Sequence, residues 1–299
     1  MSIFIVIDRN DIASMNIYDK LMQEEKVFSK SSIRFKDNPV YFYKDTYLIL
    51  NDKRSAEAEG IDQDISTITA IKPTMIIFPT VHRSKSGIPS FCAHVPGNWG
   101  SADAGGSEKR LCVSAEGFMK EALIHMHEKE KQKDIEHFDV IQEATHHGPL
   151  VSCPCMFIEI GSTEKEWDND NAGRLIANTI VYLIENSKEI IDKDYEAFVG
   201  IGGPHSCSNF MKIVLNDEKL ALGHLCPKYN LENLDGEMLE QAIEKSMRPS
   251  AMVILDWKGL GQEKERIKEL LDDKRMRYEK VKQFSYDKEE PDEDESLEL

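Results

Sequence analysis

Histidine, glycine and carboxylate residues gather in six short stretches of the chain, each of which follows an apolar run. The stretches are His94-Val95-Pro96-Gly97-Asn98, His146-His147-Gly148-Pro149, Glu159-Ile160-Gly161-Ser162-Thr163, Gly200-Ile201-Gly202-Gly203-Pro204-His205, Gly223-His224 and Asp256-Trp257-Lys258-Gly259. Core packing does not require histidine beside glycine, whereas a site where imidazoles and backbone closely approach a ligand does. The pattern predicts a metal-assisted hydrolytic site.

The paired histidines His146 and His147 are candidates for metal ligation or for acid/base chemistry. Neighbouring residues on a regular strand point to opposite faces, so both imidazoles can serve one site only if the chain turns there. The dipeptide Gly148-Pro149 is a turn signal. The alternative is a hydrogen-bonded structural pair.

Glu159 and the glycine-rich turn at 200–205 are two further candidates. A carboxylate within the apolar run 155–160 is costly unless it is paired or bound, so Glu159 is a candidate ligand or general base. The alternative is a salt bridge near the surface. The backbone amides of Gly202 and Gly203 could face an oxyanion, with His205 beside them.

Basic residues supply candidate contacts to an anionic substrate. Lys258 lies between a predicted strand and a predicted helix, where backbone amides and a cation favour a phosphate or carboxylate. The stretch 81–113 is rich in glycine, serine and proline, and we expect a largely irregular active-site loop. Its basic residues are Arg83, Lys85, Lys109 and Arg110.

Apolar runs alternating with amphipathic segments predict the fold class. Predicted strands cover 2–8, 41–50, 74–80, 138–145, 155–161, 196–201, 211–215 and 251–256, and predicted helices cover 115–130, 164–187, 235–246 and 262–275. This alternation is typical of a three-layer α/β sandwich with a mixed, largely parallel sheet. Ligands bind such folds beyond the carboxyl ends of the strands, where the six stretches are expected.

Composition limits the domain count and the partners. Residues 1–286 are expected to form one domain, and 287–299 an acidic, disordered tail of net charge -7 within a chain of -17. Excess negative charge argues against DNA as a partner. No apolar run is long enough to span a membrane, and no signal peptide is apparent, so we expect a cytoplasmic protein with reduced thiols. We also expect a monomer.

Taken together, the ordered motifs HxPGN, HHGP, EIGSTxxxW, GIGGxH, GH and DxKG resemble the archaeal and plant, zinc-dependent type of D-aminoacyl-tRNA deacylase. The resemblance extends from the first strand to about residue 285. It implies hydrolysis of the ester between a D-amino acid and tRNA, and a fold similar to phosphorylases and bacterial peptidyl-tRNA hydrolase. The chain departs from the family pattern after His205, where an aromatic and a basic residue are expected.

The resemblance also implies roles for particular residues. It matches His94, His146, His205 and His224, which we take as metal ligands for zinc, with one or two ions. A zinc ion lowers the pKa of a bound water to about 7. His147 and Glu159 are the expected acid/base residues, with the amides of Gly202 and Gly203 as oxyanion donors. Asn98, Lys258 and Lys85 are the expected substrate-binding residues.

Other activities remain open at this point. The same fold could carry a peptidyl-tRNA hydrolase or a nucleoside phosphorylase, and the histidines could belong to a metal- or tRNA-binding module without catalysis. The sequence contains no Walker A loop, no HExxH and no GxSxG. These absences argue against an NTPase, a thermolysin-like protease and an α/β-hydrolase.

Overall fold

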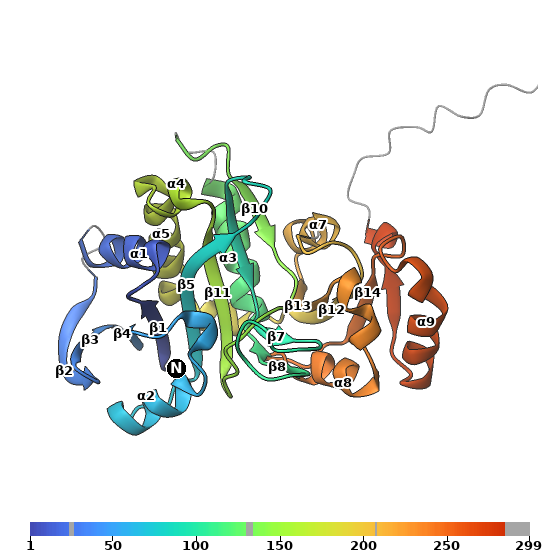
Figure 1. Ribbon diagram of the computed structural model, residues 1–299, viewed down its shortest axis with the longest axis horizontal. Helices are drawn as coiled ribbons and strands as arrows, with labels where there is room; N and C mark the ends of the chain where they lie inside the picture. The colour runs from blue at the N-terminus through green and yellow to red at the C-terminus, as the bar shows by residue number, and fades with distance from the viewer. Residues whose placement is uncertain (24–26, 130–133, 207, 285–299) are drawn as a thin grey trace, which may run out of the picture.

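A computed structural model describes residues 1–23, 27–129, 134–206 and 208–284. Its larger sheet has nine strands in this part of the chain (Figure 1). Eight of them follow the order β10 (Asp139–Gln142), β6 (Ser90–His94), β11 (Pro154–Ser162), β5 (Met75–Arg83), β1 (Ile3–Asp8), β4 (Thr46–Asn51), β3 (Asn38–Tyr43) and β2 (Ser29–Phe35), and β9 (Val113–Ser114) pairs with β11.

The centre of this sheet is parallel and its margins are mixed. Strands β4, β1, β5 and β11 run parallel, because β1 pairs in parallel with both β4 and β5, and β5 with β11. Strand β6 runs antiparallel to β11, and β10 runs parallel to β6. All six residues of β1 are buried, as expected for a strand covered on both faces.

Helices cover both faces of the sheet. Helix α5 (Asp170–Glu185) contacts both α1 (Ile12–Gln23) and α3 (Glu116–Lys129), and all three helices contact strands of the sheet. On the other face, α2 (Ile61–Thr69) is joined to the segment after β10, since Asp62 accepts a hydrogen bond of 2.9 Å from the Ser152 amide. The three-layer α/β prediction is confirmed.

A second, parallel sheet lies beside the first and has the order β13 (Leu220–Cys226), β12 (Glu196–Ile201), β14 (Met252–Leu255) and β15 (Tyr278–Lys280). Helix α3 contacts β6 and β10 as well as β13, so it packs against both sheets. Helix α7 (Ser208–Asn216) also contacts β13, and α8 (Gly236–Glu244) and α9 (Lys264–Asp273) contribute to a smaller core. Whether 1–286 is one domain stays a prediction.

Four predicted elements differ from the structure. Residues 211–215 are in α7, because Phe210, Met211, Ile213 and Val214 form the buried side of a helix. The predicted strand 41–50 is a hairpin of β3 and β4, with Lys44 at a φ of 50° in the turn.

The predicted helix 164–187 divides into α4 (Glu164–Trp167) and α5, which Asn169 caps. The stretch 81–113 is not largely irregular, since it contains β6, β7 (Gly97–Asn98) and β8 (Arg110–Leu111).

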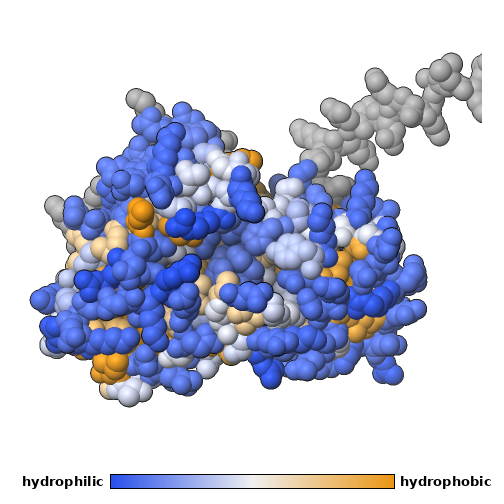
Figure 2. All heavy atoms as spheres, viewed as in Figure 1, coloured by the Kyte–Doolittle hydropathy of each residue, from blue (hydrophilic) through white to orange (hydrophobic). Residues whose placement is uncertain are grey.

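Other features agree with the sequence or lie outside the described residues. The thiols of Cys92, Cys112, Cys153, Cys155 and Cys226 are free and buried. No described helix is long and apolar enough to cross a membrane. Hydrophilic residues cover most of the face seen in Figure 2, with hydrophobic ones in small separate patches. The acidic tail 287–299 lies outside the described residues.

Three neighbouring rows of side chains on β5, β11 and β6 position the polar residues of the sheet. Residues in register across a sheet share a face, and residues two apart on a strand share it too. The rows are Phe78, Phe157 and His94; then Thr80, Glu159 and Cys92; then His82, Gly161 and Ser90. One face of the sheet therefore carries His82, Glu159 and His94 side by side.

Gly161 makes room for the third row. A Cβ atom at this position would lie 2.6 Å from Cδ2 of His82 and 2.7 Å from Oγ of Ser90. Both side chains are buried, so neither can easily move aside. The absent side chain thus lets His82 lie across β11 toward the other polar residues.

We predict that Gly161→Ala lowers the free energy of unfolding by about 1–3 kcal/mol, because overpacking displaces His82 or Ser90. Gly236→Ala is the control, since its nearest atoms belong to the flexible end of Lys274 and alanine favours a helix. Urea denaturation of both variants measures the difference. Equal stability of Gly161→Ala and wild type would contradict the packing described for this row.

Candidate active site

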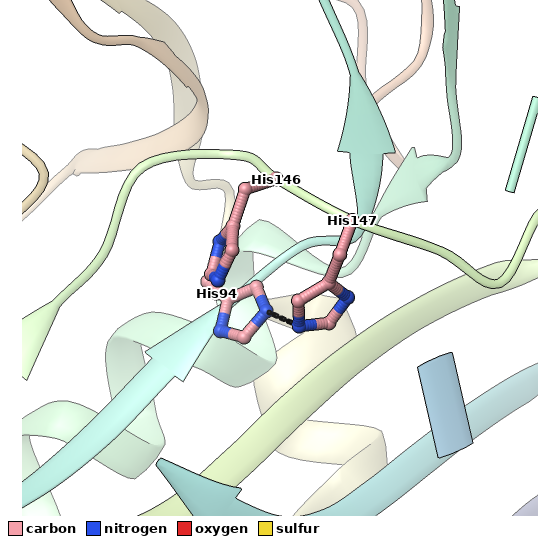
Figure 3. Close-up of side chains that lie close together, drawn as sticks. All are labelled: His94, His146 and His147. Atoms are coloured by element: carbon pink, nitrogen blue, oxygen red, sulfur yellow. Dashed lines mark hydrogen bonds between the residues drawn. The ribbon is translucent and has the colours of Figure 1, made fainter. Parts of the chain in front are cut away.

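Three imidazoles meet above the central rows of the larger sheet. His94 ends β6, and His146 and His147 follow β10 (Figure 3). The Nε2 atoms of His94 and His147 are 3.2 Å apart. The ring centroid of His146 lies 4.3 Å from that of His94 and 4.3 Å from that of His147. His146 and His147 therefore serve the same site although they are adjacent in sequence.

The chain does turn at this point. His147 has a φ of 44°, so it leaves the extended conformation that would send the two imidazoles to opposite faces. The Gly97 amide donates to the carbonyls of His146 and His147 at 3.3 and 2.7 Å, which ties the turn to β7. A Cβ at Gly148 would lie 2.1 Å from the Gly106 amide nitrogen, so only glycine fits where these two segments cross.

The second ring nitrogen of each imidazole faces an oxygen atom. The Nδ1 atoms of His146 and His147 donate to the carbonyls of Ala144 at 2.8 Å and Gly148 at 2.5 Å. The Nδ1 atom of His94 lies 3.5 Å from Oε2 of Glu143. Metal-binding histidines usually direct their other nitrogen to a carbonyl or carboxylate in this way, which leaves Nε2 for the metal.

The geometry of the three imidazoles fits a shared metal ion. Zinc–nitrogen bonds of about 2.0–2.1 Å in a tetrahedral site place two ligand nitrogens about 3.3 Å apart. The 3.2 Å between His94 and His147 is close to this separation. Ligand atoms of His94, His146 and His147 lie within 4.8 Å of one another, as do those of Glu143, His146 and His205.

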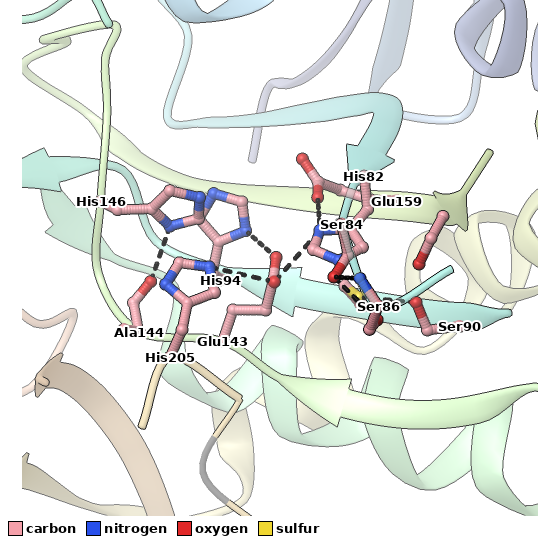
Figure 4. A network of polar contacts seen from close by, with 12 residues as sticks. His82, Ser84, Ser86, Ser90, His94, Glu143, Ala144, His146, Glu159 and His205 are labelled. Carbon is pink, nitrogen blue, oxygen red and sulfur yellow. Dashed lines mark hydrogen bonds and ion pairs between the residues drawn. The ribbon is translucent and has the colours of Figure 1, made fainter. Parts of the chain in front are cut away.

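A fully buried carboxylate, Glu143, connects these histidines to two others (Figure 4). Its Oε1 atom lies 3.1 Å from Nδ1 of His82 and 3.2 Å from Nε2 of His205, while Oε2 faces His94. The Ala144 amide donates to the His205 carbonyl at 2.9 Å, which holds the segment after β10 beside His205. Glu143 is thus surrounded by imidazoles from three separate parts of the chain.

Glu143 and His82 form the charged part of the site. Burial would raise the pKa of Glu143, but His205 and His82 outweigh it and hold this pKa well below its usual range. Burial would lower the pKa of His82, but the carboxylates of Glu143 and Glu159 raise it to about 10. At neutral pH His82 is therefore cationic and Glu143 is anionic in the metal-free protein.

The imidazoles of His94, His146 and His147 are neutral in the metal-free protein. Burial lowers the pKa of His146 to about 3, and it lowers the pKa values of His94 and His147 as well. Neighbouring imidazoles or cations also lower the pKa of each of these three histidines. Neutral imidazole is the form that binds a metal ion.

Glu159 lies beside the cluster and lines a cavity of about 220 Å³. Its Oε2 atom is 3.6 Å from Nδ1 of His82. Burial, together with the neighbouring charge of Glu143, raises its pKa to about 8. The cavity is also lined by His146, His147, His205, Arg54 and Arg83. A carboxyl group that is largely protonated near neutral pH thus faces the same space as the imidazoles.

Two predicted site residues have structural partners instead. His224 lies within β13, where its ring nitrogens contact Oγ1 of Thr145 at 3.3 Å and the Lys245 carbonyl at 2.8 Å. It does not join the imidazole cluster. Asn98 uses its amide to donate to the carbonyls of Gly105 at 2.9 Å and Ser107 at 3.3 Å. Asn98 therefore holds the 105–107 turn in place, and its contact with a substrate stays a prediction.

The glycine turn after β12 is placed differently from the expectation. The Gly202 amide donates to the Cys226 carbonyl at 2.8 Å, so it does not point at an oxyanion. Gly203 packs against Gly259, where a Cβ would lie 2.2 Å from the Gly203 nitrogen. Lys258 follows β14 and is not among the residues that line the cavity of the cluster. Arg83 does line that cavity, and Lys85 lines a groove next to it.

Sequence reasoning missed Glu143 and His82. Glu143 interrupts the run Val140-Ile141-Gln142-Glu143-Ala144 just before the paired histidines. The rule that singled out Glu159, an isolated carboxylate in an apolar run, applies equally to Glu143. His82 had no such signal, because only the register of β5 with β11 places it beside Glu159 and Ser90.

Comparisons with known proteins identify the family. A family model for D-aminoacyl-tRNA deacylase matches residues 69–279. The D-aminoacyl-tRNA deacylase of Thermococcus kodakarensis is 40% identical over 250 residues, which cover 83% of this chain and 88% of that protein. That of Pyrococcus furiosus is 37% identical over 262 residues, which cover 87% of this chain and 93% of that protein. The chain belongs to the D-aminoacyl-tRNA deacylase family.

A solved structure supports the fold. The crystal structure titled conserved protein of unknown function AF0625 superimposes on this chain with a TM-score of 0.84 at 29% sequence identity. The superposition covers 94% of this chain and 96% of the AF0625 chain. The arrangement of sheets and helices described above is therefore shared by an experimentally determined structure over nearly its whole length.

The pKa of His82 gives a testable pH dependence. A histidine whose pKa is raised on folding stabilises the folded state. This stabilisation is complete when the pH is below 6.5, the pKa of histidine in the unfolded chain, and it is lost as the pH rises through about 10, the pKa of His82 in the folded protein. We predict that NMR of the metal-free protein shows a protonated His82 imidazole at pH 8. In Glu143→Gln the titration shifts toward lower pH, whereas Glu196→Gln, at an exposed carboxylate, leaves it unchanged. A neutral His82 at pH 8 in wild type would contradict the charge assignment.

Proposed function

We propose that this protein hydrolyses the ester bond of D-aminoacyl-tRNA and releases the free D-amino acid and tRNA. The observation that carries the proposal is the cluster of His94, His146 and His147, whose Nε2 atoms are free of backbone partners beside a cavity lined by a buried carboxyl group. Family membership supplies the substrate class, because the relatives named above are D-aminoacyl-tRNA deacylases.

We further propose that His94, His146 and His147 bind one zinc ion. The alternative set of Glu143, His146 and His205 shares His146, whose Nδ1 atom already donates to the Ala144 carbonyl, so the two sets describe one ion rather than two. The chemistry that zinc would supply there is a water of lowered pKa and polarisation of the ester carbonyl. Glu143 orients His94 through Nδ1 and balances charge in the buried cluster. The sequence-based assignment of His224 as a ligand has no support in this arrangement.

The remaining steps are assigned to the chain's own side chains. His147, expected as the acid, directs its Nε2 atom at His94 and is better suited to ligation. We propose instead that Glu159 moves a proton to the leaving ribose oxygen, since it lines the cavity and is held by His82. The Gly202 amide is already bonded, so we propose no role for it as an oxyanion donor.

The proposed substrate also indicates where in the cell the protein acts. An enzyme acting on aminoacyl-tRNA works where tRNA is charged and used, so we propose that it acts in the cytoplasm. The expected monomer stays a prediction.

We predict that the purified protein releases D-tyrosine from D-tyrosyl-tRNA much faster than L-tyrosine from L-tyrosyl-tRNA. Chelation abolishes the activity and zinc restores it. Glu159→Gln lowers kcat by about 10²–10⁴-fold, as for loss of a general acid, with KM little changed. N-acetylated aminoacyl-tRNA serves as the control for peptidyl-tRNA hydrolase activity. Folded, zinc-loaded protein that releases neither amino acid would overturn the proposed function.

Zinc content is predicted to separate the imidazole cluster from other histidines. His94→Ala and His147→Ala are expected to lose bound zinc, measured by elemental analysis after gel filtration. His224→Asn and His125→Ala should retain it, because those imidazoles contact Lys245 and Thr179 outside the cluster. Full zinc occupancy in His94→Ala, or its loss in a folded His224→Asn protein, would refute the assignment of ligands.

A further inference from the structure

A cavity next to the active site has no role in the reaction proposed above. It measures about 740 Å³ and lies between β10, α7 and the chain that follows β5. Serine hydroxyls and apolar side chains, such as those of Ser90, Ser162, Phe138 and Val140, line it together with the charged groups of Glu136, Asp139 and Lys212. We call it the β10 cavity. Small-molecule sites in proteins have volumes of about 300–1,000 Å³ and a similar mixture of apolar walls and a few polar groups.

A second hollow, the Arg83 groove, runs along the ends of β5 and β11. It is lined by Arg83, Ser84, Lys85, Ser162, Thr163, Glu164, Lys165 and Trp167. The Arg83 guanidinium carbon lies 4.1 Å from the ring centroid of Trp167, which holds the cation in a fixed position. The groove thus combines cations and hydroxyls, which are the groups that bind phosphates.

The two hollows and the cavity of the imidazole cluster meet at residues 82–84. His82 lines both the cluster cavity and the β10 cavity. Arg83 lines both the cluster cavity and the Arg83 groove. Ser84 and Ser162 line both the β10 cavity and the Arg83 groove. A ligand centred on this segment could therefore place a different chemical group in each of the three spaces.

We propose that the 3′-terminal adenosine of the tRNA substrate binds in the β10 cavity and that its phosphodiester binds in the Arg83 groove. This inference rests on the proposed function. The terminal nucleotide has three parts of different chemistry: the aminoacyl ester, the nucleoside and the phosphate. The imidazole cluster fits the ester, the serine-lined cavity fits the ribose hydroxyls and base, and the cationic groove fits the phosphate.

The charges on the groove support this assignment. The chain carries a net charge of -17, so a polyanion needs a local basic surface to approach it. In the described part of the chain, Arg83, Lys85 and Lys165 form none of the ion pairs found, whereas Arg9, Arg54, Arg110 and Arg248 each pair with a carboxylate. The groove cations are thus available for an external anion.

The test measures binding of uncharged tRNA, with and without its 3′-terminal adenosine, at fixed ionic strength. Val140→Trp and Ser86→Trp each fill the β10 cavity; Ser86 is exposed, so its variant retains the fold if Val140→Trp does not. Lys85→Glu/Lys165→Glu reverses two groove charges. Lys30→Glu/Lys72→Glu is the matched control, with exposed lysines away from the groove. None of these residues belongs to the imidazole cluster.

We expect wild type to bind full-length tRNA about tenfold or more tightly than tRNA lacking the terminal adenosine, as for one bound base. A cavity-filling variant removes this difference. The groove variant weakens binding of both tRNAs at least tenfold and reduces the salt dependence, whereas the control variant changes neither. Equal preference for the terminal adenosine in wild type and both cavity variants would overturn the inference, as would equal effects of groove and control variants.

Deacylation of D-tyrosyl-tRNA by the same proteins separates this inference from the proposed function. If the nucleotide binds as proposed, the groove variant raises KM at least tenfold and leaves kcat within about threefold of wild type. If wild type deacylates D-tyrosyl-tRNA and the variants bind tRNA and hydrolyse the ester as well as wild type does, the proposed function holds and the proposed nucleotide site is refuted. Wild type that binds tRNA through the cavity without hydrolysing the ester would refute the function alone.

Discussion

The burial of one carboxylate, Glu143, determines the arrangement around it. Both oxygens lie in the interior, where an uncompensated charge is costly, and imidazoles of His82, His94 and His205 surround them. Because Glu143 stays ionised, His82 stays charged and His94 is oriented through Nδ1. Removing the carboxylate would leave a buried cation and an unoriented imidazole, so the stability of this region and its chemistry depend on the same contacts.

The mixed sheet makes this arrangement possible. Antiparallel pairing of β6 with β11 brings His94 opposite Phe157, in the interior of β11 and away from its carboxyl end. The site is therefore built on a sheet face, with the segment after β10 folded over it and Gly148 at the crossing. Paired strands of a β-sheet position the imidazoles more rigidly than a loop could. This rigidity suits a site that must hold three ligand nitrogens around one metal ion.

The sequence predicts what depends on local pattern and misses what depends on register. The apolar run 155–161 predicts β11 because a long buried strand needs no tertiary information. The short run 211–215 is ambiguous between strand and helix, and the fold resolves it as part of α7. The histidine motifs identify His94, His146, His147 and His205, but spacing alone could not separate them from His224, whose partners come from other segments.

Anomalous diffraction at the zinc absorption edge, from crystals of the protein purified without chelator, tests the central claim most directly. We predict a peak about 2.0–2.1 Å from Nε2 of His94 and of His147, with His146 as a further ligand and Glu143 in contact with Nδ1 of His94. A peak at His224, or an imidazole cluster that holds no zinc in crystals of active enzyme, would contradict it.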